Sequence, residues 1–504
     1  MNRLDYEKEV IRQLADITTY KQLEYVPNTS LIIDKLYNIL AVHNKLFIHT
    51  NSSNNNNNNN SLNNNNKNKT ALAKYVLQQE KKKLSLAKFY INMKIHKTPT
   101  LGRPICSSIG TITYHASNLL DKWLQPLAKN TMFYIKDSNN FIINLETYTF
   151  PHDCLILTAD VESLYPSIVI HDGLVQLKRA LTLAKIPSQF SNLLVDMCQW
   201  VLENNFIEFG NTTWHQIKGT SMGTPVSVCF AIIYLAMLEL DVIEICKQDS
   251  SFKYPILIKR FIDDIMSIFY DKYSALLFIT KYNLIRPNTI KLTHQLSEHS
   301  GIFLDIEIFK GERMLEGKMD YKIHQKPMNQ YLYIPPFSYH NKTMFKAFIQ
   351  SEINRYKVKC SDKNDYYNVK SLFFNRLIAR GYEIEKIIPL FETSDYDDRS
   401  NILQHLKSNQ NKSNNNCNNS PSDFSPLVLS VPLSKRTTAL NLPSIFKNQH
   451  DASFDPNYNS IFGYPPRVIV SYKRSKNLGD MIGSSRYKYS VTVSNETTIN
   501  NNNL

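Results

Sequence analysis

The sequence of 504 residues is short of glycine and cysteine and contains no Cys-x-x-Cys pair. Its seven cysteines are scattered, which argues against a disulfide scaffold or a zinc ribbon and fits a reducing compartment. Its 13 glycines are so few that each is expected to mark a backbone requirement, such as a positive φ angle or a close approach.

A secretion signal and a membrane-spanning run are also missing. Residues 1–10 mix charges of both signs and lack the apolar block of a signal peptide, so we expect a nuclear or cytoplasmic protein that is not secreted. The longest apolar stretch, 225–240, contains Ser227 and Glu239 and is shorter than the roughly 18 residues of a spanning helix. We therefore predict a core helix there and no membrane partner.

Basic residues outnumber acidic ones by 58 to 44, and the formal net charge is +14. Lysine and arginine contacts with phosphates supply most non-specific affinity for nucleic acids, so this charge is compatible with a polyanionic partner. Many basic proteins bind no nucleic acid, so the charge alone decides little. The length allows about three domains of roughly 100–200 residues and excludes a wholly disordered chain.

Asparagine-rich tracts divide the chain. Such polar runs bury too little apolar surface to offset the entropy of ordering, so we predict disordered linkers at 50–69 and 408–421 and a disordered tail at 491–504. An N-terminal helical segment is predicted at 1–49, where apolar residues recur at helical spacing: Leu31, Ile32, Leu36, Ile39 and Leu40. A C-terminal basic module is predicted at 422–490, and the stretch between the linkers is long enough for a multi-lobed enzyme.

The first of three motifs with chemical potential is 154–165. Its apolar run predicts a buried strand that presents Asp160 at its carboxyl end. Carboxylates at strand ends are suitable metal ligands, because the sheet fixes them while the following loop admits substrate. A single aspartate after a strand is more often a cap or turn residue.

The second motif is the pair Asp263 and Asp264, which stands between two apolar, β-prone runs. This pattern indicates a hairpin with carboxylates at or beside its turn. Adjacent carboxylates repel each other, so the pair is costly unless cations are shared with its surroundings. A turn with a purely structural role is the alternative.

The third motif lies between the other two in the chain and contains Gly219 and Gly223. Thr224 as N-cap and Pro225 at the first helical position predict that this loop ends at the start of a helix. Backbone at a helix N-terminus can approach phosphates or bases closely, and its amides favour anions. Together the motifs suit nucleotidyl transfer, in which two Mg²⁺ ions roughly 3.5–4 Å apart need carboxylates from separate strands.

These three motifs, at 160–165, 219–225 and 261–264, resemble the palm motifs of reverse transcriptases. Further matches are similar to the Penelope-like retroelements, for which telomerase catalytic subunits are the nearest cellular relatives. The likeness covers roughly residues 80–487. The further matches are Lys94-Ile95-His96-Lys97, Gly102-Arg103-Pro104-Ile105, Ser107-Ser108-Ile109-Gly110, Phe303-Leu304-Asp305-Ile306, Lys326-Pro327, Tyr331-Leu332-Tyr333, Ser338-Tyr339-His340, Arg380-Gly381-Tyr382 and residues 473–480.

The resemblance implies an α+β fold, a right-hand polymerase with fingers at 70–136 and an antiparallel-sheet palm, the catalytic core, at 137–300. The palm end and a helical thumb would follow at 301–407. It implies an RNA-directed DNA polymerase, encoded by a retroelement, that extends a DNA primer on an RNA template. The substrates would be dNTPs, and the cofactor would be two Mg²⁺ ions, for which Mn²⁺ is a possible substitute. No oligomeric state is indicated.

The resemblance also implies roles for individual residues. Asp160 and Asp263 would bind the metal ions, with Asp264 assisting and the Val161 carbonyl as a further possible ligand. Tyr165 would be the steric gate that crowds the sugar 2′-hydroxyl. The remaining nucleotide-binding residues would be Lys94, with Lys97 as the alternative, Arg103, Lys218, Gly219 and Phe261.

Contacts with the primer and template are expected from a basic and aromatic set of residues. Lysines and arginines would bind phosphates, and rings would stack on bases. Each of these residues could instead be part of a core or of a solvated face. The set is Lys326, Tyr331, Tyr339, His340, Lys473 and Arg474.

The sequence departs from the family pattern in three places. Lys218 stands where many reverse transcriptases have glutamine, with Gln216 displaced, which leaves the template contact open. Phe261 replaces a common tyrosine. Family members often carry a GIY-YIG endonuclease after the basic tail, whereas this sequence ends in polyasparagine, so we expect a polymerase that needs an existing 3′ end.

Three alternatives remain open at this point. Residues 160–168 also resemble the first palm motif of family B DNA polymerases, although that family's other two motifs are missing from the sequence. A decayed element that binds nucleic acid without polymerising is disfavoured by the presence of every acidic residue and loop glycine. An interaction protein that assembles through polyasparagine would keep its assembly after substitution of Asp263.

Overall fold

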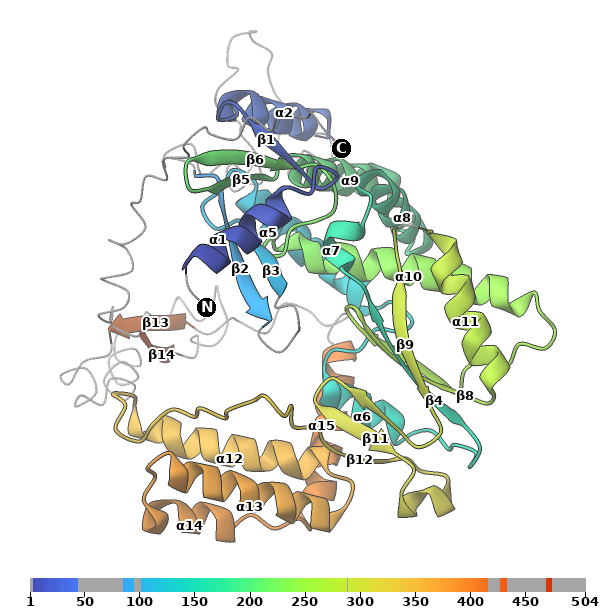
Figure 1. Cartoon of the computed structure of the whole chain (residues 1–504), viewed down its shortest axis with the longest axis vertical. Helices are drawn as coiled ribbons and strands as arrows, with labels where there is room; N and C mark the ends of the chain where they lie inside the picture. Colours follow the sequence, from blue (N-terminus) through green and yellow to red (C-terminus); the bar gives the residue numbers. More distant parts are fainter. Residues whose placement is uncertain are drawn as a thin grey trace, which may run out of the picture. The chain divides into compact units, whose positions relative to one another are not determined.

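The computed structural model describes residues 3–43, 85–94, 101–287, 289–415, 427–432 and 468–473. The protein is a mixed helix and sheet structure with two compact units, shown in Figure 1. The first unit is Met1–Gln330 with Lys359–Tyr366, and the second is Tyr331–Val358 with Tyr367–Leu504. The linker predicted at 50–69, the tail predicted at 491–504 and most of the module predicted at 422–490 lie outside the described residues.

The first unit combines helices with three sheets. Its helices are α1 (Arg3–Leu14), α2 (Thr29–Val42), α5 (Tyr114–Lys129), α6 (Ser138–Leu145), α7 (Leu164–Ser167), α8 (Ile170–Leu183), α9 (Ser188–Glu203), α10 (Val226–Lys247), α11 (Lys272–Ile285) and the 3-10 helix η2 (Glu312–Glu316). Its strands are β1 (Tyr20–Leu23), β2 (Ala87–Lys94), β3 (Leu101–Ser107), β4 (Leu155–Val161), β5 (Phe206–Phe209), β6 (Thr212–Gln216), β7 (Leu257–Phe261), β8 (Asp264–Phe269), β9 (Leu292–Ser297), β10 (Ser300–Phe303), β11 (Ile306–Phe309) and β12 (Asp320–Ile323).

A four-stranded antiparallel sheet with the order β7-β8-β4-β9 forms the centre of the first unit. Side chains on one face, including Leu157, Ala159 and Ile265, belong to the same buried core as helices α10 and α11. Strand β10, from the antiparallel sheet β10-β11-β12, contacts β4, β8 and β9. The strand predicted before Asp160 and the hairpin predicted around Asp263 are both confirmed.

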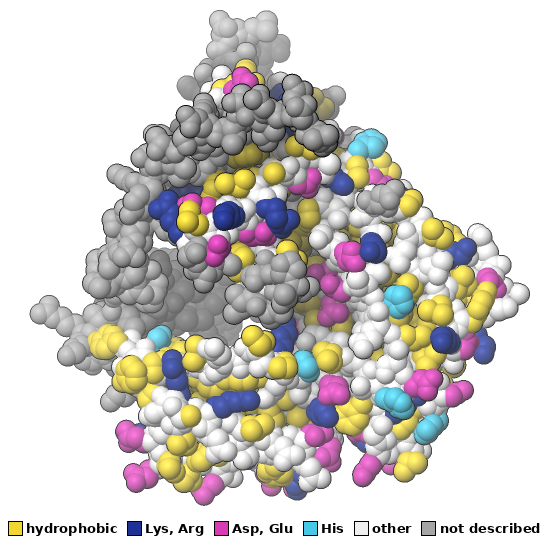
Figure 2. All heavy atoms as spheres, viewed as in Figure 1, with side chains coloured by type: hydrophobic (Ala, Val, Ile, Leu, Met, Phe, Trp, Pro, Cys, Tyr) yellow, Lys and Arg dark blue, Asp and Glu magenta, His cyan; other side chains and the backbone are white. Residues whose placement is uncertain are grey.

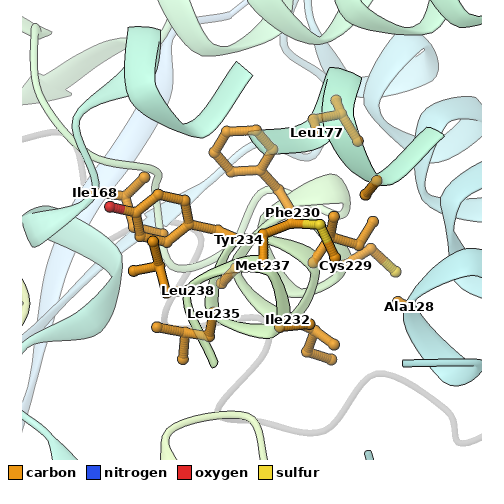
Figure 3. Close-up of a cluster of buried hydrophobic side chains, with 14 of the residues drawn as sticks. Ala128, Ile168, Leu177, Cys229, Phe230, Ile232, Tyr234, Leu235, Met237 and Leu238 are labelled. Carbon is orange, nitrogen blue, oxygen red and sulfur yellow. The ribbon is translucent and has the colours of Figure 1, made fainter. Parts of the chain in front are cut away.

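Helix α10 is the central helix of this core. Figure 3 shows its side chains extending on several sides, among them Phe230, Tyr234 and Met237, toward residues of neighbouring elements. The helix is long and apolar enough to cross a membrane, but 83% of its most apolar window is buried inside the protein. Because it is buried in this way, α10 is the core helix predicted at 225–240. Each fully buried large apolar side chain contributes about 1.5–3 kcal/mol to the stability of the fold.

The start of α10 corrects one prediction. Pro225, not Thr224, occupies the N-cap position, and the helix begins at Val226. The reason is a tertiary contact, because the Val226 amide donates a hydrogen bond to the Ser117 hydroxyl of α5 at 3.0 Å. That bond satisfies an amide that a threonine cap would otherwise serve.

A five-stranded sheet with the order β1-β6-β5-β2-β3 is built from strands between residues 20 and 216 of the first unit. Val10 and Leu14 of α1 pack against Phe89 and Ile91 of β2 in a separate buried cluster. The spacing seen in the sequence is confirmed for α2, whose buried residues are Ile32, Leu36 and Leu40. Residues 3–43 therefore supply both a strand and a covering helix to this sheet.

The second unit is mainly helical. Phe373 is at the centre of its aromatic core, where its ring contacts the rings of Tyr333, Phe348, Tyr356 and Phe391. Its helices are α12 (Lys342–Lys359), α13 (Lys363–Ala379), α14 (Ile384–Glu392) and α15 (Arg399–Asn415), and α15 runs into the linker predicted at 408–421. The backbone of β13 (Leu427–Pro432) pairs in parallel with that of β14 (Val468–Lys473).

Candidate active site

Three carboxylates lie at one end of the four-stranded sheet. Asp160 in β4 pairs directly with Asp264 in β8, so both side chains leave the sheet on the same face. Asp263 lies one residue earlier, in the two-residue turn between β7 and β8. Figure 2 shows acidic side chains in the area where β4 runs into α7 in Figure 1. The fold thus gathers three acidic groups from two separate segments.

The backbone of the turn is strained and fixed. Ile262, its first residue, has a φ of +58°, in the left-handed region that β-branched residues rarely adopt. Such strain costs on the order of 1–3 kcal/mol and persists only where the surrounding structure determines it. The Asp263 carbonyl accepts a hydrogen bond from the Val161 amide at 3.0 Å. That bond ties the turn to the strand that carries Asp160.

Asp264 is the carboxylate most affected by its surroundings. Burial, together with the charges of Asp160 and Asp263, raises the pKa of Asp264 to about 7. The Leu304 amide, which donates to Asp264 Oδ2 at 3.3 Å, opposes this rise, as does the charge of Lys326. Carboxylates that repel one another in this way favour binding of a divalent cation between them.

The three carboxylates do not enclose a metal site by themselves. Among the described residues, no three His, Cys, Asp or Glu side chains lie close enough together to enclose a metal ion. Mg²⁺ in nucleotide sites is usually bound by one or two carboxylates, while water and substrate phosphates complete its shell. Asp160 and Asp264 on neighbouring strands fit that smaller requirement. The Val161 side chain is buried, and a role for its carbonyl stays a prediction.

A groove of about 280 Å³ lies beside Asp160 and Asp264. Thr293 and Gln295 of β9 line it, and Ile302 of β10 also borders it. The Thr293 hydroxyl donates a hydrogen bond to the Asp160 carbonyl at 3.3 Å, which fixes the strand at the level of the carboxylate. The groove therefore gives an extended ligand access to the acidic groups.

A second pocket, of about 370 Å³, contains several of the predicted nucleotide-binding residues. Arg103 of β3, Tyr165 of α7 and Gly223 of the loop before α10 all line it. Burial and the charge of Asp263 raise the pKa of Tyr165 to about 12, while the Arg103 charge opposes the rise. Tyr165 is therefore close to both Arg103 and Asp263, which connects the pocket to the carboxylates.

The glycine loop fits between two backbone segments that leave no room for a side chain. Gly219, at a φ of +77°, would place a Cβ atom 2.5 Å from the Tyr165 carbonyl oxygen. Gly223, at +119°, would place one 2.4 Å from the Cys106 carbonyl oxygen of β3. The Thr220 amide donates to Tyr165 O at 2.8 Å, and the Met222 carbonyl accepts from the Cys106 amide at 2.8 Å. The loop thereby joins the two walls of the pocket.

Lys94 and Arg103 lie on the same side of the hairpin formed by β2 and β3. Arg103 pairs with Asn92, and Lys94 follows Asn92 by two residues, so the three side chains share one face. Phe89 and Ile91, which alternate with them, are buried against α1. The hairpin thus presents both cations on the face that includes the pocket wall. Lys97 lies outside the described residues.

The two remaining nucleotide-site predictions flank the carboxylates and the loop. Phe261 ends β7 and pairs with Asp264, and Lys218 is half-buried just before Gly219. Gln216 is buried, and its side chain bonds to the Asn205 amide, the Ser221 hydroxyl and the Lys218 carbonyl. Its hydrogen-bonding groups are therefore used to hold the loop, which gives Gln216 a structural role.

The predicted primer and template contacts are distributed over both units. Lys326 is exposed in the first unit, and its charge acts on Asp264. In the second unit, Tyr339 and His340 are exposed, whereas the Arg376 guanidinium carbon lies 3.6 Å from the centre of the Tyr331 ring. The Lys473 side chain and all of Arg474 lie outside the description. These roles stay predictions.

Sequence reasoning missed three residues around the site. Leu304 supplies the amide that contacts Asp264, a role that its motif, Phe303-Leu304-Asp305-Ile306, does not reveal in the sequence. Arg260 and Glu239 form a buried ion pair behind the hairpin turn. A glutamate inside a long apolar helix was a usable signal, because a buried charge needs a partner. The identity of that partner was not readable from the sequence.

Comparison with known proteins gives structural likenesses only. No protein-family model and no curated protein match this sequence. Similar solved structures include telomerase from Candida albicans with a fragment of telomeric RNA, at 12% identity and a TM-score of 0.47, covering 77% of this chain and 65% of that one. Apo telomerase from Candida tropicalis, truncated from its C-terminal domain, has 13% identity and a TM-score of 0.36, with 45% and 53% covered.

The RNA-dependent RNA polymerase of a human picobirnavirus is a further similar structure, at 12% identity and a TM-score of 0.43, with 65% of each chain covered. This chain spans from about half to two thirds of the length of these three structures. At such identities and TM-scores, the functional argument rests on the residues of this chain and their geometry.

Proposed function

We propose that this chain is a template-directed nucleic-acid polymerase, a reverse transcriptase of the Penelope-like kind that extends a DNA primer on an RNA template with dNTPs. One observation carries the proposal. Asp160 and Asp264 face each other on β4 and β8, with Asp263 in the adjoining turn. Tyr165, which lines the neighbouring pocket with Arg103, is close enough to Asp263 for its charge to act on the tyrosine pKa.

In the proposed mechanism, Asp160 and Asp263 hold the metal ions and Asp264 assists them. Bound Mg²⁺ would activate the primer 3′-hydroxyl and stabilise the charge of the departing pyrophosphate. Arg103 and Lys94, on one face of the hairpin, would bind the triphosphate through charge-assisted hydrogen bonds. Holding the primer end and the nucleotide in register can contribute about 7–11 kcal/mol to barrier lowering.

The pocket suggests how the sugar would be selected. Tyr165 is half-buried, and the Gly219 loop is packed directly against its backbone. The loop fixes the Tyr165 backbone and the side chain packs against the buried core, so we expect the ring to crowd a ribose 2′-hydroxyl and to favour dNTPs. Exposed Lys326 would bind a backbone phosphate near the carboxylates, and Tyr339 and His340 would contact the duplex.

The test is primer extension on poly(rA)/oligo(dT) and on poly(dA)/oligo(dT) by the wild type, Asp263→Ala and Asp153→Ala. Asp153 is an exposed aspartate before the opposite end of β4 and serves as the matched control. We expect dTTP incorporation on the RNA template, a loss of at least ~100-fold in Asp263→Ala, and wild-type activity in Asp153→Ala.

Each other outcome has a definite meaning. Activity confined to the DNA template would favour a DNA-templated polymerase. Duplex binding by all three proteins without extension would favour a non-catalytic remnant that binds nucleic acid. Equal extension by the wild type and Asp263→Ala would show that the carboxylates described above are not the catalytic centre.

A further inference from the structure

The buried ion pair behind the hairpin turn links the turn to the core helix. Arg260 of β7 is 1% exposed and Glu239 of α10 is 2% exposed. The Arg260 Nε donates to one carboxylate oxygen of Glu239, and Nη2 donates to the other at 3.1 Å. Nη2 also donates to the Ile232 carbonyl of α10 at 3.0 Å. The guanidinium is therefore fixed in orientation by a single helix.

The same guanidinium contacts the hairpin turn between β7 and β8. Its Nη1 donates a hydrogen bond to the Ile262 carbonyl at 2.9 Å. Ile262 is the residue with the positive φ angle, and its carbonyl belongs to the peptide that enters Asp263. The Arg260 backbone is held as well, because its amide donates to Phe133 O at 2.7 Å and its carbonyl accepts from Ile135 N at 3.1 Å.

The orientation of that peptide decides where the Asp263 side chain lies. In two-residue hairpin turns, the alternative turn types differ in the rotation of the central peptide, and the common ones favour glycine, asparagine or aspartate at positive φ, whereas here the residue at positive φ is Ile262. Because isoleucine does not favour this conformation by itself, an external contact must select it. Arg260 fixes the peptide before Asp263, and the Val161 amide fixes the carbonyl after it at 3.0 Å.

We propose that Arg260, oriented by Glu239, is a positioning residue that sets the direction of the Asp263 carboxylate. This inference rests on the proposed function for its catalytic consequence, although the geometry it describes can be tested separately. Ser227 and Val228, in the first turn of α10, line the pocket with Tyr165. One rigid helix thus contacts both the nucleotide pocket and the hairpin turn, so α10 sets the distance between the pocket and the turn.

A purely stabilising role does not account for this arrangement. Burying two charges costs more than an apolar pair of similar size, and replacing such pairs by apolar residues is often neutral or stabilising. A guanidinium that reaches a turn carbonyl and both oxygens of a carboxylate uses the planar fork that lysine lacks. The proposed positioning role of Arg260 therefore depends on the directions of its N–H donors.

The test compares Arg260→Met/Glu239→Leu, Arg260→Lys and Arg286→Met with the wild type. The double variant removes both charges together and leaves none unpaired in the core. Arg286 forms an ion pair with Asp172 at 2.8 Å and contacts none of the carboxylates at the site, so Arg286→Met controls for the loss of a guanidinium. Amide hydrogen exchange of the peptide containing Val161 and primer extension are measured for each protein.

We expect the double variant to fold, to exchange the Val161 amide at least ~10-fold faster than the wild type, and to lose at least ~100-fold in kcat. Its KM for the dNTP should stay within a few fold, because the nucleotide pocket is not altered. Arg260→Lys should show the faster exchange while keeping the charge next to Glu239. Arg286→Met should change neither quantity.

Wild-type exchange at Val161 in both Arg260 variants would overturn the inference, and so would equal acceleration in Arg286→Met. If the double variant fails to fold, Arg260→Lys decides the question by the same measurement. If the wild type extends no primer, the proposed function has failed, while the exchange data still test the positioning of the turn.

Discussion

Replacing Gly219 by alanine tests how tightly the glycine loop is packed against the nucleotide pocket. The new Cβ atom would lie 2.5 Å from both the Tyr165 carbonyl oxygen and the Pro166 Cα, and both are backbone atoms that cannot rotate away. Gly110→Ala is a matched control, because its φ of +78° equals that of Gly219 within a degree, and its nearest atom is the Ser85 hydroxyl oxygen at 3.6 Å.

The magnitudes follow from these contacts. A left-handed backbone costs an alanine roughly 1–2 kcal/mol, and both variants bear this cost. Gly219→Ala must in addition displace Tyr165, which strains the packing by ~1–3 kcal/mol and weakens the Thr220–Tyr165 hydrogen bond, worth ~0.5–1.5 kcal/mol. We therefore expect Gly219→Ala to lower the free energy of unfolding by about 2 kcal/mol more than Gly110→Ala.

Urea denaturation followed by tryptophan fluorescence measures this difference. The three tryptophans, Trp123, Trp200 and Trp214, all belong to the first unit, so the signal reports unfolding of that unit alone. In primer extension, Gly219→Ala should also raise the KM for the dNTP, because Tyr165 moves. Equal destabilisation by the two variants would refute the close packing of Gly219 on Tyr165.

Tyr165→Ala should relax discrimination against ribonucleotides, whereas Tyr165→Phe should retain it, as measured by incorporation of rUTP against dTTP. If Tyr165→Ala still excludes ribonucleotides as well as the wild type does, Tyr165 is not the steric gate. Hydrogen bonds from Arg12, and then from Gln13 and the Gly102 amide, lower the pKa of Glu9 to about 2. The ionised Glu9 carboxylate therefore stabilises the folded protein above pH 4.5, and this contribution is lost as the pH falls toward 2. Glu9→Gln should therefore cost about 1–2 kcal/mol at pH 6 and less than half of that at pH 3 in urea denaturation, and a pH-independent cost would contradict the pairing. Because burial raises the pKa of Asp264 to about 7, Mn²⁺ must displace a proton below that pH, and its Kd by electron paramagnetic resonance should rise by up to ~10-fold between pH 8 and pH 6. Equal Kd values at pH 6 and pH 8 would count against Asp264 as a ligand.

The parts of the site that could be predicted from sequence are those with a local cause. The apolar run before Asp160 makes a buried strand whatever its neighbours are, and the Asp263-Asp264 pair between two β-prone runs makes a hairpin. The length and composition of 225–240 make a core helix. In each case the residues that determine the element lie within a few positions of it.

The parts that could not be predicted depend on contacts between distant segments. The register that sets Asp160 opposite Asp264 joins residues more than a hundred positions apart. The Val226 amide finds its acceptor in Ser117 of another helix, which explains the helix start one residue late. The sequence shows Arg260 as a charge near the turn, but its hydrogen bond to the Ile262 carbonyl requires the orientation that α10 imposes.

The position of residues 3–43 bears on how this protein can be handled. Strand β1 pairs with β6, and α1 covers the apolar side of β2. A chain shortened to begin at residue 85 would expose Phe89, Ile91 and Ile207 to solvent. It would also make β6 an unpaired edge strand, through which protein chains aggregate. Such a trimmed protein would precipitate or misassemble even with every motif intact, so its inactivity would say nothing about catalysis.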